Sequence, residues 1–343
     1  MVIKNKSKEN KIIKLVVVPT IMLIILAFWG CECPHCQCPD ESSPVIIVPN
    51  DYKDIQEAID SLPNEGGTVY IKAQVYNISQ GIHVNKSNIT IIGENGTCIK
   101  LADHVNQPVI LIGSEEELPS YSNKNIRISN IEIDGNKINQ DSETDPERTW
   151  IRNNGIDIRM TDNLYIDNVN IHDARSGGIV ASWNCHRIII ENSYFHDNFF
   201  DGIALYSSED ICISNFFCYG NNEAGLSLDN RLKLVSFNDG LIKNNGDVGI
   251  FVRNSEDISF HGLTIKSNGS HGCFLSHKSQ GTNTGVKRMF FDGCAFLDND
   301  GWGLWLASTI DDSPKNTVSA SLFSGNIIGA INGPVEESGN IFQ

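Results

Sequence analysis

The chain has 343 residues, enough for two ordinary domains. Its formal net charge is −16, although a basic stretch of five lysines stands within residues 4–14. A surface this acidic repels the phosphates of nucleic acids, so we exclude nucleic acid as a partner. One repeated phrase fills most of the chain, and this favours a single domain behind an N-terminal segment.

Residues 1–30 combine the lysine-rich flank with LVVVPTIMLIILAFWG, a run of sixteen residues without a charge. This length lies between that of a signal-peptide core and that of a spanning helix. The lysines orient the N-terminus toward the cytoplasm. We therefore expect a signal peptide or membrane anchor, with the rest of the chain outside the cytoplasm at the cell surface.

Residues 31–44 form a cysteine-rich tether, in which Cys31, Cys33, Cys36 and Cys38 surround His35. Lipidation of Cys31 is one interpretation. Disulfides are another outside the cell, and zinc or an iron–sulfur cluster is a third. We rank a tether or disulfides above a metal.

One amphipathic helix is expected within residues 50–66. A capping Asn50 or Asp51 precedes apolar residues at helical spacing, and Pro63 and Gly66 stop the pattern. Such a helix would cover the open end of the domain that follows it.

A short phrase containing glycine recurs every 23 or 24 residues between Asn154 and Ser308, with one step of 31 residues. Its copies are NGIDIR, GGIVAS, DGIALYS, AGLSLDN, VGIFVRN, HGCFLSH and WGLWLAS. The residues one and three places after each glycine are almost all apolar, whereas those two and four places after are mixed. This period of two predicts β-strands with one buried face and one exposed face.

A second strand region follows in each unit, as in LYIDNVNI, RIIIENSYF, ICISNFFC, ISFHGLTI and MFFDGCAF, and a small polar residue or glycine bends each one. No unit contains ten residues of helical pattern, so the chain must return by winding into a coil. Successive coils would stack about 4.8 Å apart and bury their apolar faces against each other. Residues 45–343 are thus expected to form an all-β, single-stranded parallel β-helix solenoid.

These coils resemble the right-handed parallel β-helix (pectin-lyase-like, or pectate-lyase) superfamily. The stretch GGTVYIKAQVYNISQGIHVNKSNITIIGENGTCIKL is also similar to the entry coils of that superfamily. The resemblance extends over roughly residues 45–330. It implies a right-handed solenoid, and because its members usually act on polysaccharides, it implies a carbohydrate partner.

Two insertions, at residues 114–125 and 136–154, precede the regular repeat, and a third lies at residues 277–287. The second ends where the first regular strand begins, so we expect it to wall one side of a groove along the stacked strands. Trp150 in this insertion is either a stacking platform for sugar or a residue that pins the loop.

Stacking places residues with equal offsets from the glycines side by side on the outer face. Four residues after their glycines, Tyr206, Asp229 and Arg253 would lie on consecutive coils, and Arg159 has the same offset in the first copy. A base, an acid and a cation this close suit proton abstraction beside a uronate carboxyl. The alternative is a solvated sheet with alternating charges.

For that chemistry we predict Tyr206 as base or acid, Arg159 or Arg253 as the cation that neutralises the carboxylate, and Asp229 as the residue that orients one of them. Asp157, two residues after its glycine, completes the catalytic candidates. Further substrate-binding candidates are Trp150, Trp183, Trp305 and Asp201.

Comparison with characterised motifs gives partial matches. Polygalacturonase-like hydrolases carry NTDG and GHG phrases, whereas this chain has RNNG at Asn154 and keeps only the histidine, at His271. Alginate-epimerase-like modules show YGFDPHE and DGFVADY. The phrases NGIDIR and DGIALY keep Asp157 and Asp201 but lack the histidine, and Tyr206 stands in place of the second aspartate.

The leading interpretation is an exported, surface-tethered β-helix protein that acts on polysaccharide, as a lyase or epimerase rather than a hydrolase. The competing interpretations are a non-catalytic module that binds glycan or protein through the same face, and a purely structural stalk. The net charge favours a neutral polysaccharide, or an acidic one bridged by calcium. Calcium is the one cofactor left open, no metal ligands are assigned, and the oligomeric state is undetermined.

Overall fold

The computed structural model describes residues 44–276, 285–307 and 315–343. The expected membrane segment and cysteine-rich tether, within residues 1–43, lie outside these ranges. Among the described residues no helix is long and apolar enough to cross a membrane.

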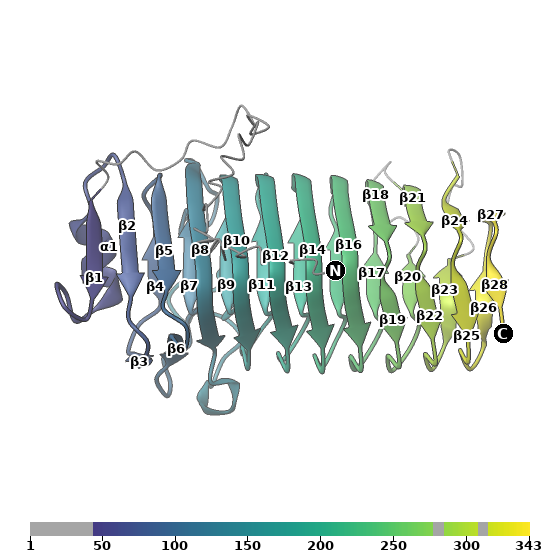
Figure 1. Ribbon diagram of the computed structural model, residues 1–343, viewed down its shortest axis with the longest axis horizontal. Helices are drawn as coiled ribbons and strands as arrows, with labels where there is room; N and C mark the ends of the chain where they lie inside the picture. Colours follow the sequence, from purple (N-terminus) through teal and green to yellow (C-terminus); the bar gives the residue numbers. More distant parts are fainter. Residues whose placement is uncertain (1–43, 277–284, 308–314) are drawn as a thin grey trace, which may run out of the picture. The chain divides into compact units, whose positions relative to one another are not determined.

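The described residues form a parallel β-helix, with coils stacked along one axis (Figure 1). One sheet, sheet B, holds ten parallel strands, one from each coil. These strands are β4 (Ile82–Val84), β7 (Ile110–Gly113), β9 (Ile156–Arg159), β11 (Ile179–Ser182), β13 (Ile203–Tyr206), β15 (Leu226–Asp229), β17 (Ile250–Val252), β20 (Cys273–Leu275), β23 (Trp302–Leu306) and β26 (Gly329–Asn332).

The other sheet, sheet A, holds the second strand region of each coil, and its strand pairs are also parallel. Its strands are β1 (Val45–Val48), β2 (Gly67–Ile71), β3 (Val75–Ile78), β5 (Ile89–Gly93), β6 (Cys98–Leu101), β8 (Asn123–Asp134), β10 (Thr161–His172), β12 (His186–His196), β14 (Glu209–Tyr219), β16 (Lys233–Lys243), β18 (Glu256–His261), β19 (Thr264–Lys266), β21 (Lys287–Asp292), β22 (Ala295–Leu297), β24 (Thr317–Ser319), β25 (Leu322–Ser324), β27 (Glu336–Ser338) and β28 (Ile341–Phe342).

The bend inside each long strand region falls where the sequence predicts it. Asn168, Asn192, Asn215, Gly262 and Gly293 have φ of 51°, 53°, 49°, 64° and 63°. Asparagine and glycine tolerate this left-handed backbone better than other residues. Each long region therefore folds into two faces, and in the later coils it divides into two short strands, such as β18 and β19.

The register confirms that the glycine phrases stack in step. Ile156, Ile179 and Ile203 are direct partners on β9, β11 and β13, and Leu226 and Ile250 continue the row on β15 and β17. These side chains are buried in the interior of the solenoid. Aromatic rings extend the same core, since Phe260 stacks on Phe237 at 5.4 Å and on Phe291 at 4.6 Å between ring centroids.

A column of buried asparagines holds one turn of every coil in place. Asn198, Asn221, Asn245, Asn268 and Asn299 donate amide to amide along the axis at 2.8–3.0 Å, and their side-chain oxygens accept main-chain N–H groups from the preceding coil. None of these five residues has a left-handed backbone. Their role is hydrogen bonding across coils, and the left-handed position belongs to the residue before them, as at Asp197 and Asn244.

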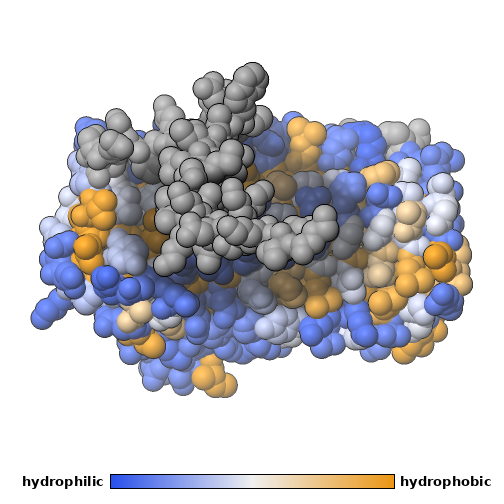
Figure 2. All heavy atoms as spheres, in the orientation of Figure 1, coloured by the Kyte–Doolittle hydropathy of each residue, from blue (hydrophilic) through white to orange (hydrophobic). Residues whose placement is uncertain are grey.

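Helix α1 (Ile55–Ser61) covers the N-terminal coil, as predicted. Ile55, Ala58 and Ile59 are buried against the first strands, and the side chain of Asp54 caps the helix by accepting from Glu57 N at 3.0 Å. The capping residue is therefore Asp54 and not Asn50 or Asp51. At the other end no helix follows among the described residues, and Figure 2 shows hydrophobic groups gathered there. Ile341 and Phe342 are 57% and 52% exposed.

Candidate functional site

The first two insertions form a common wall beside sheet B, and Arg159 fastens them. Arg159 is buried at the end of β9, and its guanidinium donates to the carbonyls of Ser114 at 2.9 Å and Trp150 at 3.3 Å. The Trp150 indole N–H donates to the carbonyl of Glu115 at 3.0 Å. Because these donors are engaged by main chain, Arg159 holds the wall and we leave it out of the substrate contacts.

A cavity of about 360 Å³, the strand cavity, opens on the outer face of sheet B beside this wall. Arg152 and Asn154 line it from the second insertion, and Asp201 and Tyr206 from the two ends of β13. Ala204 lines its floor, and this small side chain leaves space at the outward position that Phe251, Phe274 and Trp305 fill on later coils. Binding sites for small ligands commonly have a volume of this order.

Burial sets the protonation of the acids in and beside this cavity. It raises the pKa of Asp201 to about 6, although the N–H of Ala224, at 3.0 Å, and the hydroxyl of Ser227 favour the ionised form. It also raises the pKa of Asp157 to about 6, against the opposing effects of Arg159 and the N–H of Arg152. A carboxyl that titrates near neutral pH is suited to general acid–base catalysis.

Tyr206 stays protonated at neutral pH. Burial raises the pKa of its phenol, and the negative charges of Asp201 and Asp229 raise it further. Its hydroxyl lies 3.4 Å from Ser227 Oγ. Tyr206 is therefore placed to donate a proton or a hydrogen bond into the strand cavity rather than to act as a base.

The predicted row of Tyr206, Asp229 and Arg253 is brought together. Tyr206 and Asp229 are direct partners on β13 and β15, and Arg253 Nε donates to Asp229 Oδ2 at 2.8 Å. Asp229 is buried, while the Arg253 side chain is 42% exposed. The Asp229 carboxylate is thus already paired with Arg253, and its orienting role in catalysis stays a prediction.

The remaining predicted residues are spread over the molecule. Trp183 lies at the corner after β11 and is 41% exposed, while Trp150 lies on the wall and is 40% exposed. Trp305 stacks on Phe274 at 4.4 Å, four strands beyond β13, or about 19 Å at the usual strand spacing. His271 lies beside Trp305 at 4.6 Å, so it does not reach the strand cavity.

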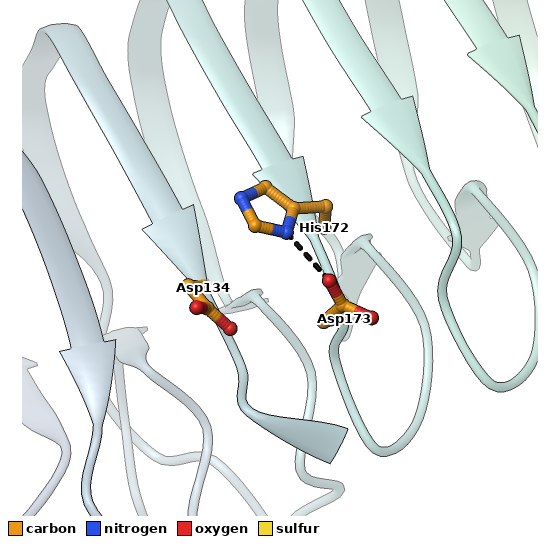
Figure 3. Close-up of side chains that lie close together, drawn as sticks. All are labelled: Asp134, His172 and Asp173. Carbon is orange, nitrogen blue, oxygen red and sulfur yellow. Dashed lines mark hydrogen bonds and ion pairs between the residues drawn. The ribbon is translucent and has the colours of Figure 1, made fainter. Parts of the chain in front are cut away.

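A second cluster on sheet A resembles a metal site in composition. Asp134, His172 and Asp173 present ligand atoms within 4.8 Å of one another, and His172 Nδ1 lies 2.8 Å from Asp173 Oδ2 (Figure 3). Lys100 pairs with Asp134 at 2.5 Å and Lys137 with Asp173 at 3.4 Å. These ammonium groups supply the positive charge that a cation would otherwise bring, so the cluster is a network of ion pairs.

Arg152 lines the strand cavity although no sequence motif points to it. The Arg152 guanidinium lies over the ring of Phe200 at 5.4 Å and makes no ion pair within the described part of the chain. The one sequence feature that could have indicated this residue is its position, two residues before Asn154, where the second insertion meets the first regular strand.

Comparisons with known proteins agree with this architecture. A family model described as a right handed beta helix region matches residues 154–287. This chain is a right-handed parallel β-helix protein. The β-helix has the pectate-lyase-like fold, since pectate lyase Pel9A superposes with a TM-score of 0.58 at 12% identity, over 87% of this chain and 78% of Pel9A.

Mannuronan C5-epimerases of Azotobacter vinelandii are among the relatives of the β-helix. AlgE2 is 28% identical over 232 residues, which are 62% of this chain and 22% of AlgE2. The match therefore spans less than a quarter of that relative. The A-module of AlgE4 superposes with a TM-score of 0.51 at 18% identity, over 83% of this chain and 94% of the module. The two superpositions show a shared fold.

Proposed function

We propose that this protein acts on a uronate polysaccharide by removing the C5 proton of one sugar unit in the strand cavity. The observation that carries the proposal is the convergence of Asp201, Tyr206 and Arg152 on one cavity. A base, a proton donor and a cation are the three groups that this reaction needs. The relationship to mannuronan C5-epimerases supports the same class of chemistry.

Each residue has a distinct role in the proposed reaction. Asp201, with its pKa of about 6, is ionised at neutral pH and accepts the C5 proton. Arg152 pairs with the sugar carboxylate and stabilises the negative charge that develops there. This assignment moves the base from Tyr206 to Asp201, because the raised pKa of Tyr206 keeps the phenol protonated.

Removal of the C5 proton leaves a carbanion at C5, and two reactions can follow from it. In elimination, the electron pair of the C5–H bond forms a C4=C5 double bond, the C4–O bond breaks, and Tyr206 protonates the leaving oxygen. In epimerisation, Tyr206 returns a proton to C5 on the opposite face and no bond to oxygen breaks. Epimerisation exchanges the C5 hydrogen with one from solvent, whereas elimination removes it. Only elimination gives an unsaturated product.

The test incubates the purified full-length protein with a panel of uronate and neutral polysaccharides in deuterated buffer, with and without calcium. We expect C5 deuterium by NMR, or ultraviolet absorbance from a C4=C5 bond, with a uronate polymer. Asp201→Asn should lower the rate by about 100-fold or more, whereas Asp239→Asn, an exposed aspartate on sheet A, should not. Retention of a uronate polymer without exchange would instead establish a non-catalytic binding module.

We also propose that the protein is exported and tethered at the cell surface. Support comes from the lysines and the uncharged run within residues 1–30. Protease treatment of intact cells should digest the β-helix. Its recovery in the soluble cytoplasmic fraction would contradict this part of the proposal.

A further inference from the structure

A second and larger hollow, the corner cavity, lies next to the strand cavity. Its volume is about 1100 Å³, and Trp183, Ser207 and Arg231 line it at the corners that follow β11, β13 and β15. Tyr206 and Asn230 line the strand cavity. The residues that follow them in the chain, Ser207 and Arg231, line the corner cavity. Since consecutive Cα atoms are about 3.8 Å apart, the two cavities adjoin along this edge of sheet B.

Trp183 stands at a corner of the coil that is left-handed in the neighbouring coils as well. Its φ is 65°, and the equivalent corner residues Met160, Ser207, Asn230 and Asn254 have φ of 50°, 46°, 60° and 49°. Left-handed backbone is costly for most L-residues and is tolerated best by glycine and asparagine. The conformation belongs to the corner of the coil, and the large aromatic side chain is what distinguishes Trp183 from the corners of later coils.

The Trp183 side chain is also available to a ligand. It is 41% exposed, and its indole N–H makes no hydrogen bond within residues 44–276, 285–307 and 315–343. The guanidinium of Arg159 lies 5.9 Å from the ring centroid. An exposed aromatic ring that lines a cavity is the usual platform for a sugar ring, because it offers apolar area at a low entropic cost.

Arg231 gives the corner cavity an unpaired positive charge. The other charged groups that line it are matched: Arg187 pairs with Asp162, Lys233 with Glu209, and Glu256 with Arg288. Arg231 is exposed, and its guanidinium makes no ion pair with any described residue. In a chain with a net charge of −16, an unpaired arginine in a cavity favours an anionic ligand, and its planar fork fits a carboxylate.

We propose that the corner cavity binds a second uronate unit of the same polysaccharide chain, with Trp183 stacking on the sugar ring and Arg231 pairing with its carboxylate. The identity of the chain rests on the proposed function of the strand cavity. The corner cavity then requires a substrate of at least two linked acidic sugars, because a single unit in the strand cavity does not reach Trp183.

The test compares Trp183→Asn and Arg231→Gln with the wild type on a polyuronate and on the methyl glycoside of a single uronate unit, which fills one cavity only. Asparagine already occupies the equivalent corners at Asn230 and Asn254, so Trp183→Asn suits the local backbone. With the polymer, each variant should raise KM by about tenfold, the effect of one lost stacking or charge contact, and leave kcat within about twofold. With the single-unit glycoside, the dissociation constant should be the same in the variants and the wild type.

Two variants on the outer face of sheet A serve as matched controls. Tyr194→Ala removes a ring that is 40% exposed, and Arg127→Gln removes an exposed guanidinium. Both should bind and convert the polymer as the wild type does. The inference is wrong if Trp183→Asn and Arg231→Gln match these controls on the polymer.

Calorimetric binding of the polyuronate separates this inference from the proposed reaction. If the wild type binds the polymer without turnover and both corner variants bind it about tenfold more weakly, the subsite is established and the catalytic proposal fails. If turnover occurs and binding is the same in all variants, the catalytic proposal stands and the subsite is overturned. If no polyuronate binds to the wild type, both are overturned.

Discussion

At the scale of single residues, the buried carboxyl of Asp157 on β9 and the partly buried carboxyl of Asp201 just before β13 distinguish this part of the molecule. Both have a pKa of about 6, and in both the first cause is burial. Burial stabilises the neutral form of a carboxylic acid, so it places the titration of these groups near neutral pH. The raised pKa of Asp201 should affect the pH dependence of catalysis. The raised pKa of Asp157 should affect the pH dependence of the free energy of unfolding.

The first prediction concerns the pH dependence of turnover. The base must be ionised, so kcat/KM should rise about tenfold per pH unit below about pH 6 and level off above it. Asp201→Asn should remove this dependence together with most of the rate. A wild-type rate that is equal at about pH 5 and about pH 8 would exclude a base with this pKa.

The second prediction concerns the free energy of unfolding. The native state holds the Asp157 proton more tightly than the unfolded chain, since the pKa rises from 3.8 to about 6. Ionisation therefore destabilises the native state as pH rises from about 4 to about 6. Asp157→Asn should raise the free energy of unfolding by about 1 to 3 kcal/mol above that range, and by progressively less below it. Urea unfolding of both proteins across this pH range measures the difference, and a loss of stability in Asp157→Asn at about pH 8 would contradict it.

At the scale of elements, the coils are held by contacts that repeat and by contacts that occur once. The asparagine column repeats, because the same residue stands four places before successive glycines. The wall made by the first two insertions occurs once, and it depends on Arg159. Repeated contacts give the stack its stability, and the single wall gives one stretch of sheet B its cavity.

The third prediction tests the asparagine column. Asn245 accepts from Asn221 N at 3.2 Å and Asn221 Nδ2 at 3.0 Å, and it donates to Asn268 Oδ1 at 3.0 Å. Asn245→Ala leaves these buried groups unpaired and should lower the free energy of unfolding by about 3 to 5 kcal/mol. Asn215→Gly breaks the exposed amide contact with Asn192, at 2.7 Å, and glycine adopts the left-handed backbone at this position, so the variant should cost less than about 1 kcal/mol. Similar losses in chemical denaturation of the two variants would argue against a special role for the buried column.

At the scale of the whole molecule, the net charge opposes the proposed ligand while the cavities attract it. The charge of −16 acts at long range, whereas Arg152 and Arg231 act at contact. Salt screens the long-range term first, because the Debye length falls from about 30 Å at 0.01 M to about 8 Å at 0.15 M. The overall field and the local site are therefore separable by ionic strength.

The fourth prediction follows from that difference. The association rate of a polyuronate should increase between about 0.01 M and about 0.15 M salt, as repulsion by the acidic surface is screened. Stopped-flow measurement of the wild type gives the rate, and a neutral polysaccharide should show no such increase. A rate for the polyuronate that falls steadily with salt would mean that the basic residues govern the approach.

The regular part of the molecule was predictable because its information is local and repeated. Glycine spacing and the period of two specify strands and coils, and the bends at Asn192 and Asn215 follow from the conformational tolerance of asparagine. The row of Tyr206, Asp229 and Arg253 followed from the repeat alone and is present as a paired register with an ion pair. The role of Arg159 could not be predicted, because it depends on where two irregular insertions fold.

The sequence by itself determined the parallel β-helix, its N-terminal cap and the order of residues along sheet B. A repeated pattern fixes the register of each coil on the last, since a slip would expose every apolar side chain. Only the tertiary structure decided that Arg152, Asp201 and Ala204 line one cavity, and that burial raises the pKa of two aspartates to about 6. Burial and cavity shape depend on residues distant in the chain, so no local pattern specifies them.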